Sequence, residues 1–496
     1  MPMASHAEEA DRDIAAAVAK LAPSLEAYVE SGMKDFDVPG TAIGIIVGDD
    51  LVYAKGFGVR AKSDARAVDP ATLFQIGSTT KAFLATTMAI AVDRGKFQWD
   101  DRVVDLLPGF QLKDAWVTRE FRMFDLLAQR SGLPAYANDT LSSFGYGKDW
   151  MIRSLRYVDP VSSFRTTFAY TNITHLIAGD IVAAAEGAAD WFAVLQEELL
   201  DPLGMDHTTY TAAAMNAAPN HATGHRYQAD GSVEIPFDQF FPYDFAGAGA
   251  INSSIEQLVP WIRLLLNEGM LDGKTIVSKQ NLHTTWMPRV ALADTVAYAN
   301  GWILMATPNG TVTWHNGGTD GFGAFVGINL SRRIGVVVLT NETNVGFPDA
   351  IGIWIFDRLL GNPDVDHVAS TLKRAVGGFE ESVRTFARPD DPQPAPPLAP
   401  LAGRFESPVF GAATLAEADG ALLLSLAETG AKFRLSPWDG GVFTVTLVAE
   451  GDFVRMADIL GPQPQAFAAF VTGADGLPDT LRITFPDDQA YDFRRK

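Results

Sequence analysis

The sequence FQIGSTTKAFLATTMAIAVDRG, residues 74–95, decides how the chain is interpreted. It starts as a short apolar, strand-like piece, passes through a glycine, and continues as an apolar run without a helix breaker. The pattern predicts a helix over residues 78–94 with few charges, which therefore belongs in the protein interior. Ser78 stands at the head of this helix, and Lys81 follows three residues later.

The spacing of Ser78 and Lys81 is suited to nucleophilic catalysis. Helical residues three apart share a face, with about 5–6 Å between their Cβ atoms. A serine hydroxyl needs a base to become a nucleophile, and a lysine can be that base if burial or a helix amino terminus lowers its pKa. Ser-x-x-Lys also occurs at Ser31 and Ser370, where it fits a solvated helix face, and Ser78 itself could be an ordinary N-cap serine.

A second element, FAYTNITHLIAGDIV, places Tyr170 and Asn172 two residues apart just before a predicted helix that runs to about Ala185. In an extended segment these side chains share a face. A tyrosine can relay a proton, and an asparagine can donate to a carbonyl and accept from a lysine. Tyr-x-Asn also begins at Tyr136 and Tyr298, so the pattern equally fits packed aromatic residues.

A third element, TVTWHNGGTDGFGAF, ends a predicted strand at His315, which is followed by Asn316, Gly317 and Gly318. Two adjacent glycines allow a substrate carbonyl to approach the backbone closely. A strand-edge N–H that points into a cleft can form half of an oxyanion hole. A glycine-rich hairpin with a surface histidine is the alternative interpretation.

Composition limits the classes of function. The chain has 496 residues, a net charge of −21 and no cysteine. The negative charge disfavours nucleic acid and anionic membranes as partners, and the lack of cysteine excludes disulfides and thiolate chemistry. The polar, acidic start and the absence of an apolar run of about 20 residues predict a cytoplasmic protein, or a periplasmic one if a leader has been removed. No cofactor is expected, and the loop-like sequence around His221 and His225 does not favour a metal site.

The order of predicted elements indicates an α+β fold. A helix is expected at about 10–35, a hairpin around Asp49-Asp50, strands in TVTWHNGG, GAFVGINL and IGVVVLTN, and a helix at about 348–361. Residues 100–290 are predicted to be mostly helical. We therefore expect one antiparallel sheet built from both ends of the domain, flanked by helices and with a helical insert.

The composition changes at RPDDPQPAPPLAP, residues 388–400, where six of thirteen residues are proline. Such a segment is typical of an extended, semi-rigid spacer. Short alternating runs with turn signals follow it and predict a small all-β barrel or sandwich. The expected domains are residues 1–385, a linker at 386–400, and a β domain at 401–496.

Together the three ordered elements resemble the serine β-lactamase and penicillin-binding-protein superfamily. The branch that looks most similar contains class C β-lactamases, D-Ala-D-Ala carboxypeptidases and family VIII esterases. The segments SGLP at 131–134, DPLGM at 201–205 and AGAGAINSS at 246–254 agree with this resemblance, which covers about residues 25–360. The carboxy-terminal part resembles lipocalin-like domains attached to some peptidases of the superfamily.

The resemblance implies a role for each matching residue. Ser78 would accept the acyl group, Lys81 would be its base, and Tyr170 would pass the proton to the leaving group. Asn172 would orient the substrate amide and Lys81, and the N–H groups of Ser78 and Gly318 would form the oxyanion hole.

His315 occupies the third-motif position, where many relatives have Lys-Thr-Gly. Histidine is mostly neutral at pH 7, and Asn316 replaces a hydroxyl, so the anchor for a substrate carboxylate is weakened. Gly317 completes this substrate-binding segment.

We therefore expect a serine hydrolase that cleaves amide or peptide bonds of a small molecule or short peptide through an acyl-enzyme. The alternatives are an esterase or transesterase with at most weak β-lactamase activity, and a non-catalytic ligand-sensing module. A homo-oligomer is compatible with the sequence. Aromatic residues of the predicted loops are candidates for the pocket wall, although each also fits a partial core: Tyr136, Phe144, Tyr146, Trp150, Phe241, Tyr243 and Phe322.

Overall fold

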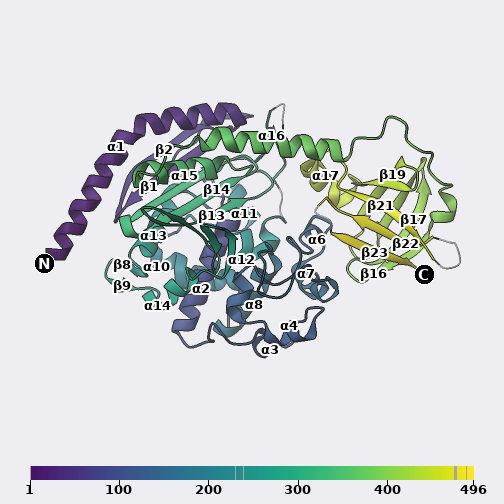
Figure 1. Ribbon diagram of the computed structural model, residues 1–496, viewed down its shortest axis with the longest axis horizontal. Coiled ribbons are helices and arrows are strands. Elements are labelled where there is room, and N and C mark those ends of the chain that lie inside the picture. Colours follow the sequence, from purple (N-terminus) through teal and green to yellow (C-terminus); the bar gives the residue numbers. More distant parts are fainter. Residues whose placement is uncertain (1, 229–230, 238–239, 474–477, 487–488) are drawn as a thin grey trace. The chain divides into compact units, whose positions relative to one another are not determined.

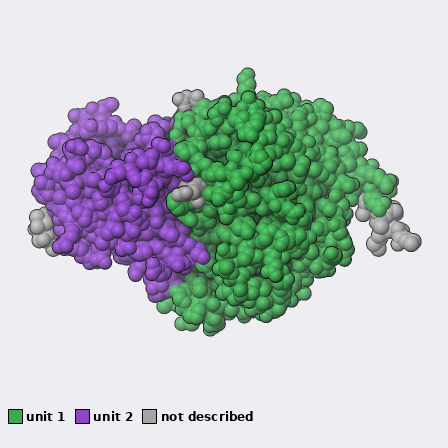
Figure 2. Space-filling view, turned by 180° about the vertical axis from the view of Figure 1, so that it is seen from behind, with its two compact units in different colours: residues 1–110, 114–135, 160–376 green, residues 111–113, 136–159, 377–496 purple. Residues whose placement is uncertain are grey.

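The computed structural model describes residues 2–228, 231–237, 240–473, 478–486 and 489–496 (Figure 1). The chain forms two compact units, coloured separately in Figure 2. Unit 1 comprises residues 1–110, 114–135 and 160–376, and unit 2 comprises residues 111–113, 136–159 and 377–496. Within the described ranges, no helix is long and apolar enough to cross a membrane.

A nine-stranded antiparallel sheet forms the centre of unit 1, in the order β10-β11-β12-β13-β14-β15-β1-β2-β3. Its strands come from both ends of the unit, as the sequence predicts. The strands are β1 (Gly40–Val47), β2 (Asp50–Ala61), β3 (Asp64–Ala67), β10 (Val290–Ala293), β11 (Val296–Tyr298), β12 (Ile303–Thr307), β13 (Gly310–Gly318), β14 (Gly323–Asn329) and β15 (Ile334–Thr340). Strands β10 to β12 extend the sheet beyond β13 and are not among the strands that the sequence predicts.

Helices cover both faces of this sheet and fill the rest of unit 1 (Figure 1). They are α1 (Pro2–Phe36), α2 (Thr80–Asp93), α3 (Val103–Leu106), α4 (Ala115–Glu120), α5 (Met123–Leu127), α8 (Ile173–Glu186), α9 (Trp191–Leu195), α10 (Asp201–Leu203), α11 (Ala212–Ala217), α12 (Ala246–Gly249), α13 (Ile255–Leu266), α14 (Lys279–Thr285) and α15 (Phe347–Leu360). Helix α16 (His367–Thr385) continues from unit 1 into unit 2. Three two-stranded sheets pair β4 (Phe74–Gln75) with β7 (Asn252–Ser253), β5 (His225–Arg226) with β6 (Val233–Glu234), and β8 (Met270–Leu271) with β9 (Lys274–Thr275).

Every residue of β1, β14 and β15 is buried, because helices pack on both faces of the central strands. On one face, α1 and α15 form a continuous apolar core with the sheet. On the other face, α13 approaches so closely that a Cβ at Gly335 would lie 2.2 Å from the Ile262 side chain. The glycine therefore permits the helix–sheet contact, and the sheet gives a rigid base to the segments at its edge.

The predicted buried helix after Ser78 is present as α2, in which every residue from Thr80 to Val92 is buried. It starts two residues later than predicted, because residues Gly77–Thr79 form a 3-10 turn, η1, that precedes the helix. Gly77 has φ +50°, a left-handed conformation that disfavours residues with a Cβ. The turn directs the chain from β4 into α2.

Unit 2 contains a closed eight-stranded barrel in which consecutive strands pair from β16 to β23. Of the two predicted alternatives, a barrel and a sandwich, the barrel is therefore correct. Its strands are β16 (Gly403–Ser407), β17 (Gly411–Ala418), β18 (Ala421–Leu426), β19 (Lys432–Asp439), β20 (Val442–Leu447), β21 (Ala466–Thr472), β22 (Pro478–Thr484) and β23 (Ala490–Arg495), and α17 (Val454–Leu460) lies between β20 and β21.

Residues 136–159, with α6 (Thr140–Ser143) and α7 (Lys148–Ser154), belong to the same compact unit as the barrel. Phe144 packs edge-on against Phe433 with 4.7 Å between ring centroids, and the Tyr146 hydroxyl donates to the Phe410 carbonyl at 2.5 Å. The aromatic residues of this segment therefore pack within unit 2. The domain limits at 385 and 400 stay a prediction.

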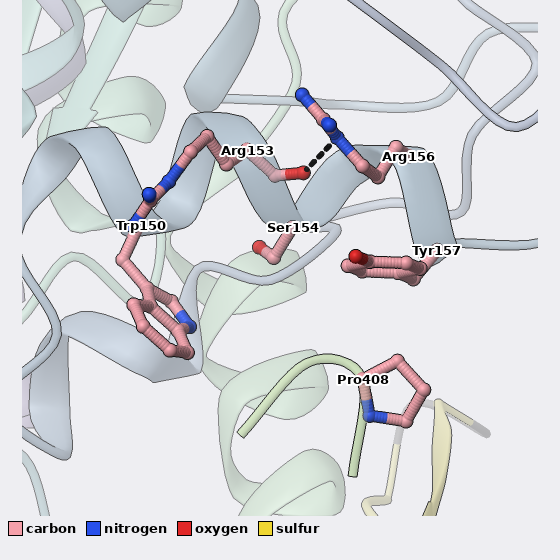
Figure 3. A pocket seen from close by; sticks show the side chains of 6 residues that line it. All are labelled: Trp150, Arg153, Ser154, Arg156, Tyr157 and Pro408. Atoms are coloured by element: carbon pink, nitrogen blue, oxygen red, sulfur yellow. Dashed lines mark hydrogen bonds between the residues drawn. The ribbon is translucent and has the colours of Figure 1, made fainter. Parts of the chain in front are cut away.

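A cavity of about 260 Å³ lies between α7 and the barrel (Figure 3). Trp150 and Tyr157 flank the cavity, and the indole N–H of Trp150 donates to the Val409 carbonyl at 2.7 Å. In Figure 3 the Arg153 side chain lies over the indole, whose centroid is 5.3 Å from the guanidinium carbon. The Trp150 indole therefore already has both a hydrogen-bond partner and a cation–π contact.

Candidate active site

Ser78 lies in the turn η1, where its side chain does not cap the following helix. Thr79 is the N-cap residue of α2, and neither helix start has a side-chain capping bond. The Ser78 hydroxyl instead lies 3.0 Å from Nζ of Lys81. The N-cap interpretation of Ser78 is therefore wrong, and the predicted pairing with Lys81 is present.

Lys81 is completely buried, and its amine is surrounded by oxygen atoms. Nζ lies 2.6 Å from Oδ1 of Asn172 and 2.8 Å from the Ala248 carbonyl, in addition to its contact with Ser78. A carbonyl oxygen can only accept a hydrogen bond, whereas a hydroxyl can donate or accept. A neutral amine can thus donate to both carbonyls and present its lone pair to the Ser78 hydroxyl. This arrangement suits proton transfer from Ser78 to Lys81.

The second predicted element lies beside the same amine. The ring centroid of Tyr170 is 4.7 Å from Nζ of Lys81, and Tyr170 is half-buried. Asn172 precedes α8, and its side chain does not cap that helix. The sequence-predicted residues Ser78, Lys81, Tyr170 and Asn172 therefore meet at one place in unit 1.

The end of β13 packs directly against the turn that carries Ser78. A Cβ at Gly317 would lie 1.9 Å from the Ile76 carbonyl oxygen and 3.2 Å from the backbone nitrogen of Ser78. A Cβ at Gly77 would lie 2.7 Å from the backbone nitrogen of Gly318. The two glycines allow this close backbone approach, which puts Gly318 beside Ser78 as an oxyanion hole requires.

His315 is a buried residue of β13, only 1 % exposed. Its Nδ1 lies 2.5 Å from the carbonyl oxygen of Asn316, and its Nε2 lies 2.9 Å from the Tyr298 hydroxyl. Because a carbonyl only accepts, Nδ1 carries the proton and the Tyr298 hydroxyl donates to Nε2. Burial and the nearby charge of Lys81 lower the pKa of His315 to about 3, although the bond to Asn316 opposes the shift. The ring is therefore neutral at neutral pH.

Asn316 directs its side chain away from Ser78, toward α15. Its Nδ2 donates to Oδ2 of Asp349 at 3.0 Å. Asn344 donates through its Nδ2 to the Gly317 carbonyl at 2.8 Å. Two side chains from the segment after β15 thus hold the residues that precede Gly318.

Apart from Tyr298, which contacts His315, the other copies of the sequence patterns lie elsewhere. Ser31 and Ser370 are exposed residues of α1 and α16, as expected for solvated helix faces, and Tyr136 lies in unit 2. His225 accepts the Lys62 N–H at Nε2 and contacts the Asn341 carbonyl through Nδ1. Among the described residues, no three His, Asp or Glu side chains form a group that could hold a metal ion.

Three contributors to the site were not predicted as such. The Ala248 carbonyl lies within the AGAGAINSS segment, but no side-chain pattern shows that it reaches Lys81. Tyr298 was recognised only as a third Tyr-x-Asn, not as the partner of His315. The sequence places Asp349 in the first turn of a predicted helix but does not indicate that it contacts Asn316.

The comparisons with known proteins agree with this fold. Residues 25–357 match the Beta-lactamase family, and residues 387–495 match a domain of unknown function, DUF3471. An unguisins hydrolase of Aspergillus campestris is 26 % identical over 490 residues, which cover 92 % of this chain and 88 % of that protein. Penicillin-binding protein 4 of Amycolatopsis lactamdurans is 27 % identical over 382 residues, which cover 74 % of this chain and 93 % of that protein.

A solved structure shares the fold over nearly the whole chain. The octameric penicillin-binding protein homologue from Pyrococcus abyssi superimposes with a TM-score of 0.61 at 20 % identity, covering 95 % of this chain and all of that one. The fold and the matched residues define a serine hydrolase of the β-lactamase and penicillin-binding-protein type. The chain belongs to the Beta-lactamase family.

Proposed function

We propose that the protein cleaves amide or peptide bonds through an acyl-enzyme formed on Ser78. The observation that carries the proposal is the hydroxyl of Ser78 at 3.0 Å from the fully buried amine of Lys81. Two carbonyl oxygens fix the direction of that amine. A nucleophile and its base held in this way are the basis of covalent catalysis.

The proposed reaction has two half-reactions. Lys81 takes the Ser78 proton as Oγ attacks the substrate carbonyl, and the N–H groups of Ser78 and Gly318 stabilise the oxyanion. The C–N bond breaks as the amine leaves with a proton delivered through Tyr170. Water then attacks the ester on Ser78 and gives a proton to the same base. The base returns this proton to Oγ as the ester C–O bond breaks, which releases the carboxylic acid and free Ser78.

The relatives support hydrolysis. Two proteins that align with 92 % of this chain, from Aspergillus campestris and Aspergillus violaceofuscus, are named unguisins hydrolases. Their alignments extend across both the catalytic part and the barrel. We propose that this chain shares hydrolytic chemistry with them.

The third element favours substrates without a carboxylate at the subsite beside β13. His315 is buried and neutral, and the amide donor of Asn316 is bonded to Asp349. Neither side chain offers a cation to a substrate anion. We therefore expect neutral amides or esters to be better substrates than acids such as penicillins.

Intact mass after incubation with a fluorophosphonate tests the covalent step. Wild type should gain one adduct, Ser78→Ala should gain none, and Ser31→Ala should behave as wild type, because Ser31 is exposed on α1. An unlabelled wild type would contradict the proposal and favour a ligand-sensing module. Turnover of matched amides and esters by wild-type enzyme that has not been exposed to the fluorophosphonate then separates the amidase from the esterase alternative.

A further inference from the structure

The end of strand β13 is held by two side chains that follow strand β15. Asp349 accepts a hydrogen bond from Nδ2 of Asn316 at 3.0 Å. Asn344 donates from its Nδ2 to the carbonyl oxygen of Gly317 at 2.8 Å. These two contacts fix the two residues immediately before Gly318, one through its side chain and one through its backbone.

Asn344 is itself held in one orientation. Its Oδ1 accepts the N–H of Gly346 at 2.8 Å, which leaves its Nδ2 directed at Gly317. Gly346 has φ +107°, and a Cβ there would lie 2.6 Å from the Thr371 side chain. The turn into α15 is thus packed against α16, and it can serve as a fixed support.

Asp349 occupies a place where a carboxylate is costly. Burial raises its pKa to about 6, and bonds to Asn316 and Asn344 together with the charge of Arg374 on α16 oppose that rise. Its Oδ1 is buried without a hydrogen-bond partner among the described residues. A buried acid destabilises a fold unless its interactions compensate, and one of the interactions of Asp349 is with the strand that carries Gly318.

We propose that Asp349 and Asn344 are positioning residues that hold the end of β13 so that the Gly318 N–H faces the carbonyl attacked by Ser78. The inference rests on the proposed acyl-enzyme chemistry. Neither residue is placed in contact with the reacting atoms, so both act through the strand. Their loss should slow the chemical step and leave ground-state binding largely intact.

The test compares steady-state hydrolysis of an activated aryl acetate by three variants of the full chain. We expect Asp349→Ala to lower kcat by about 10–100-fold, as a small misplacement of a catalytic group does, with KM changed by less than about threefold. Asp349→Asn keeps an acceptor oxygen of the same shape and should recover most of kcat. Asn344→Asp replaces the donor by an acceptor that faces the Gly317 carbonyl, and its kcat should fall by as much as that of Asp349→Ala.

Asp357→Ala is the matched control on the same helix. Asp357 also accepts from an asparagine, Asn362, at 3.0 Å, and it contacts His367 at 2.7 Å. Its removal should lower the melting temperature but leave kcat per folded molecule unchanged.

Wild-type kcat in Asp349→Ala or in Asn344→Asp would overturn the inference. So would an equal loss in Asp349→Asn and Asp349→Ala, because the acceptor oxygen would then not be the decisive feature. The isosteric Asn344→Asp keeps the test informative if Asp349→Ala does not fold. Failure of wild type to form an adduct on Ser78 would instead overturn the proposed function, so the two failures are distinguishable.

Discussion

Replacing Gly317 by alanine tests directly whether the end of β13 must touch the turn of Ser78. The added Cβ would lie 1.9 Å from the Ile76 carbonyl oxygen and 2.8 Å from its carbon. Both obstructing atoms belong to the backbone, so no side-chain rotation can relieve the overlap. Strand and turn must separate by about 1 Å to reach 3.0 Å, the lower limit that Cβ atoms observe.

A separation of this size should be visible in the rate. A 1 Å misplacement can cost on the order of 10²-fold, and loss of an oxyanion-hole donor costs about 10²–10³-fold. We therefore expect Gly317→Ala to lower kcat/KM for an activated aryl acetate by roughly 10²–10³-fold, with the Ser78 and Lys81 side chains still present. Stopped-flow detection of the released phenol would measure acylation separately from deacylation.

The control is Gly335→Ala in the same sheet. Its Cβ would lie 2.2 Å from the Ile262 side chain, at the far end of β15 from the site. This variant should lose stability to a similar clash and keep its activity per folded molecule. Wild-type acylation by a folded Gly317→Ala would refute the oxyanion assignment, because the strand would then be dispensable for the reaction.

Three other substitutions test the groups around Lys81. Tyr298→Phe should lower the free energy of unfolding, measured in urea, by about 1–3 kcal/mol, because Nε2 of His315 stays buried without its donor. The pKa of His315 in the folded protein is about 3, below the ordinary value near 6.5, so the free energy of unfolding of wild type should fall by up to about 1.4 kcal/mol per pH unit as the pH drops between these values. His315→Gln should make this fall smaller, as urea titrations at pH 7 and pH 5 would show. An equal fall in both proteins would count against the argument. Tyr170→Phe should reduce amide turnover by about 10²-fold or more and activated-ester turnover much less, since an amine leaving group needs a proton; equal losses would argue against that role.

The local part of the site could be predicted from the sequence. Ser78 and Lys81 are three residues apart, so helical geometry alone brings them together once the apolar run is recognised as α2. The order of strands β13 to β15 also follows from apolar runs that are joined by short turns. Both features are set by residues that lie close to one another in the sequence.

The remaining contacts join segments that are distant in sequence. The Ala248 carbonyl is 167 residues from Lys81, and Asp349 is 33 residues from Asn316. No periodicity encodes these contacts, because they depend on how α12 packs against α2 and α8 and on how α15 packs against the sheet. The same reason explains Phe144 and Tyr146, whose segment lies in a helical insert by sequence but packs with the barrel strands.

The polar groups around Lys81 are compatible with the proton exchange that the proposed reaction requires between this lysine and Ser78. The groups that accept from Lys81, the Asn172 amide oxygen and the Ala248 carbonyl, carry no net charge. A carboxylate in their place would strongly favour the ammonium form of Lys81 and keep the proton on its nitrogen. The buried imidazoles of His175 and His315 lie nearby, and burial is the main reason why the pKa of His175 is well below its usual value. The pKa of His315 is lowered in the same manner, so neither ring competes for the proton at neutral pH. In the proposed reaction, Lys81 is therefore the acceptor of the Ser78 proton. The neutral ring of His315 does not compete for this proton, and it offers no cation to an anionic substrate.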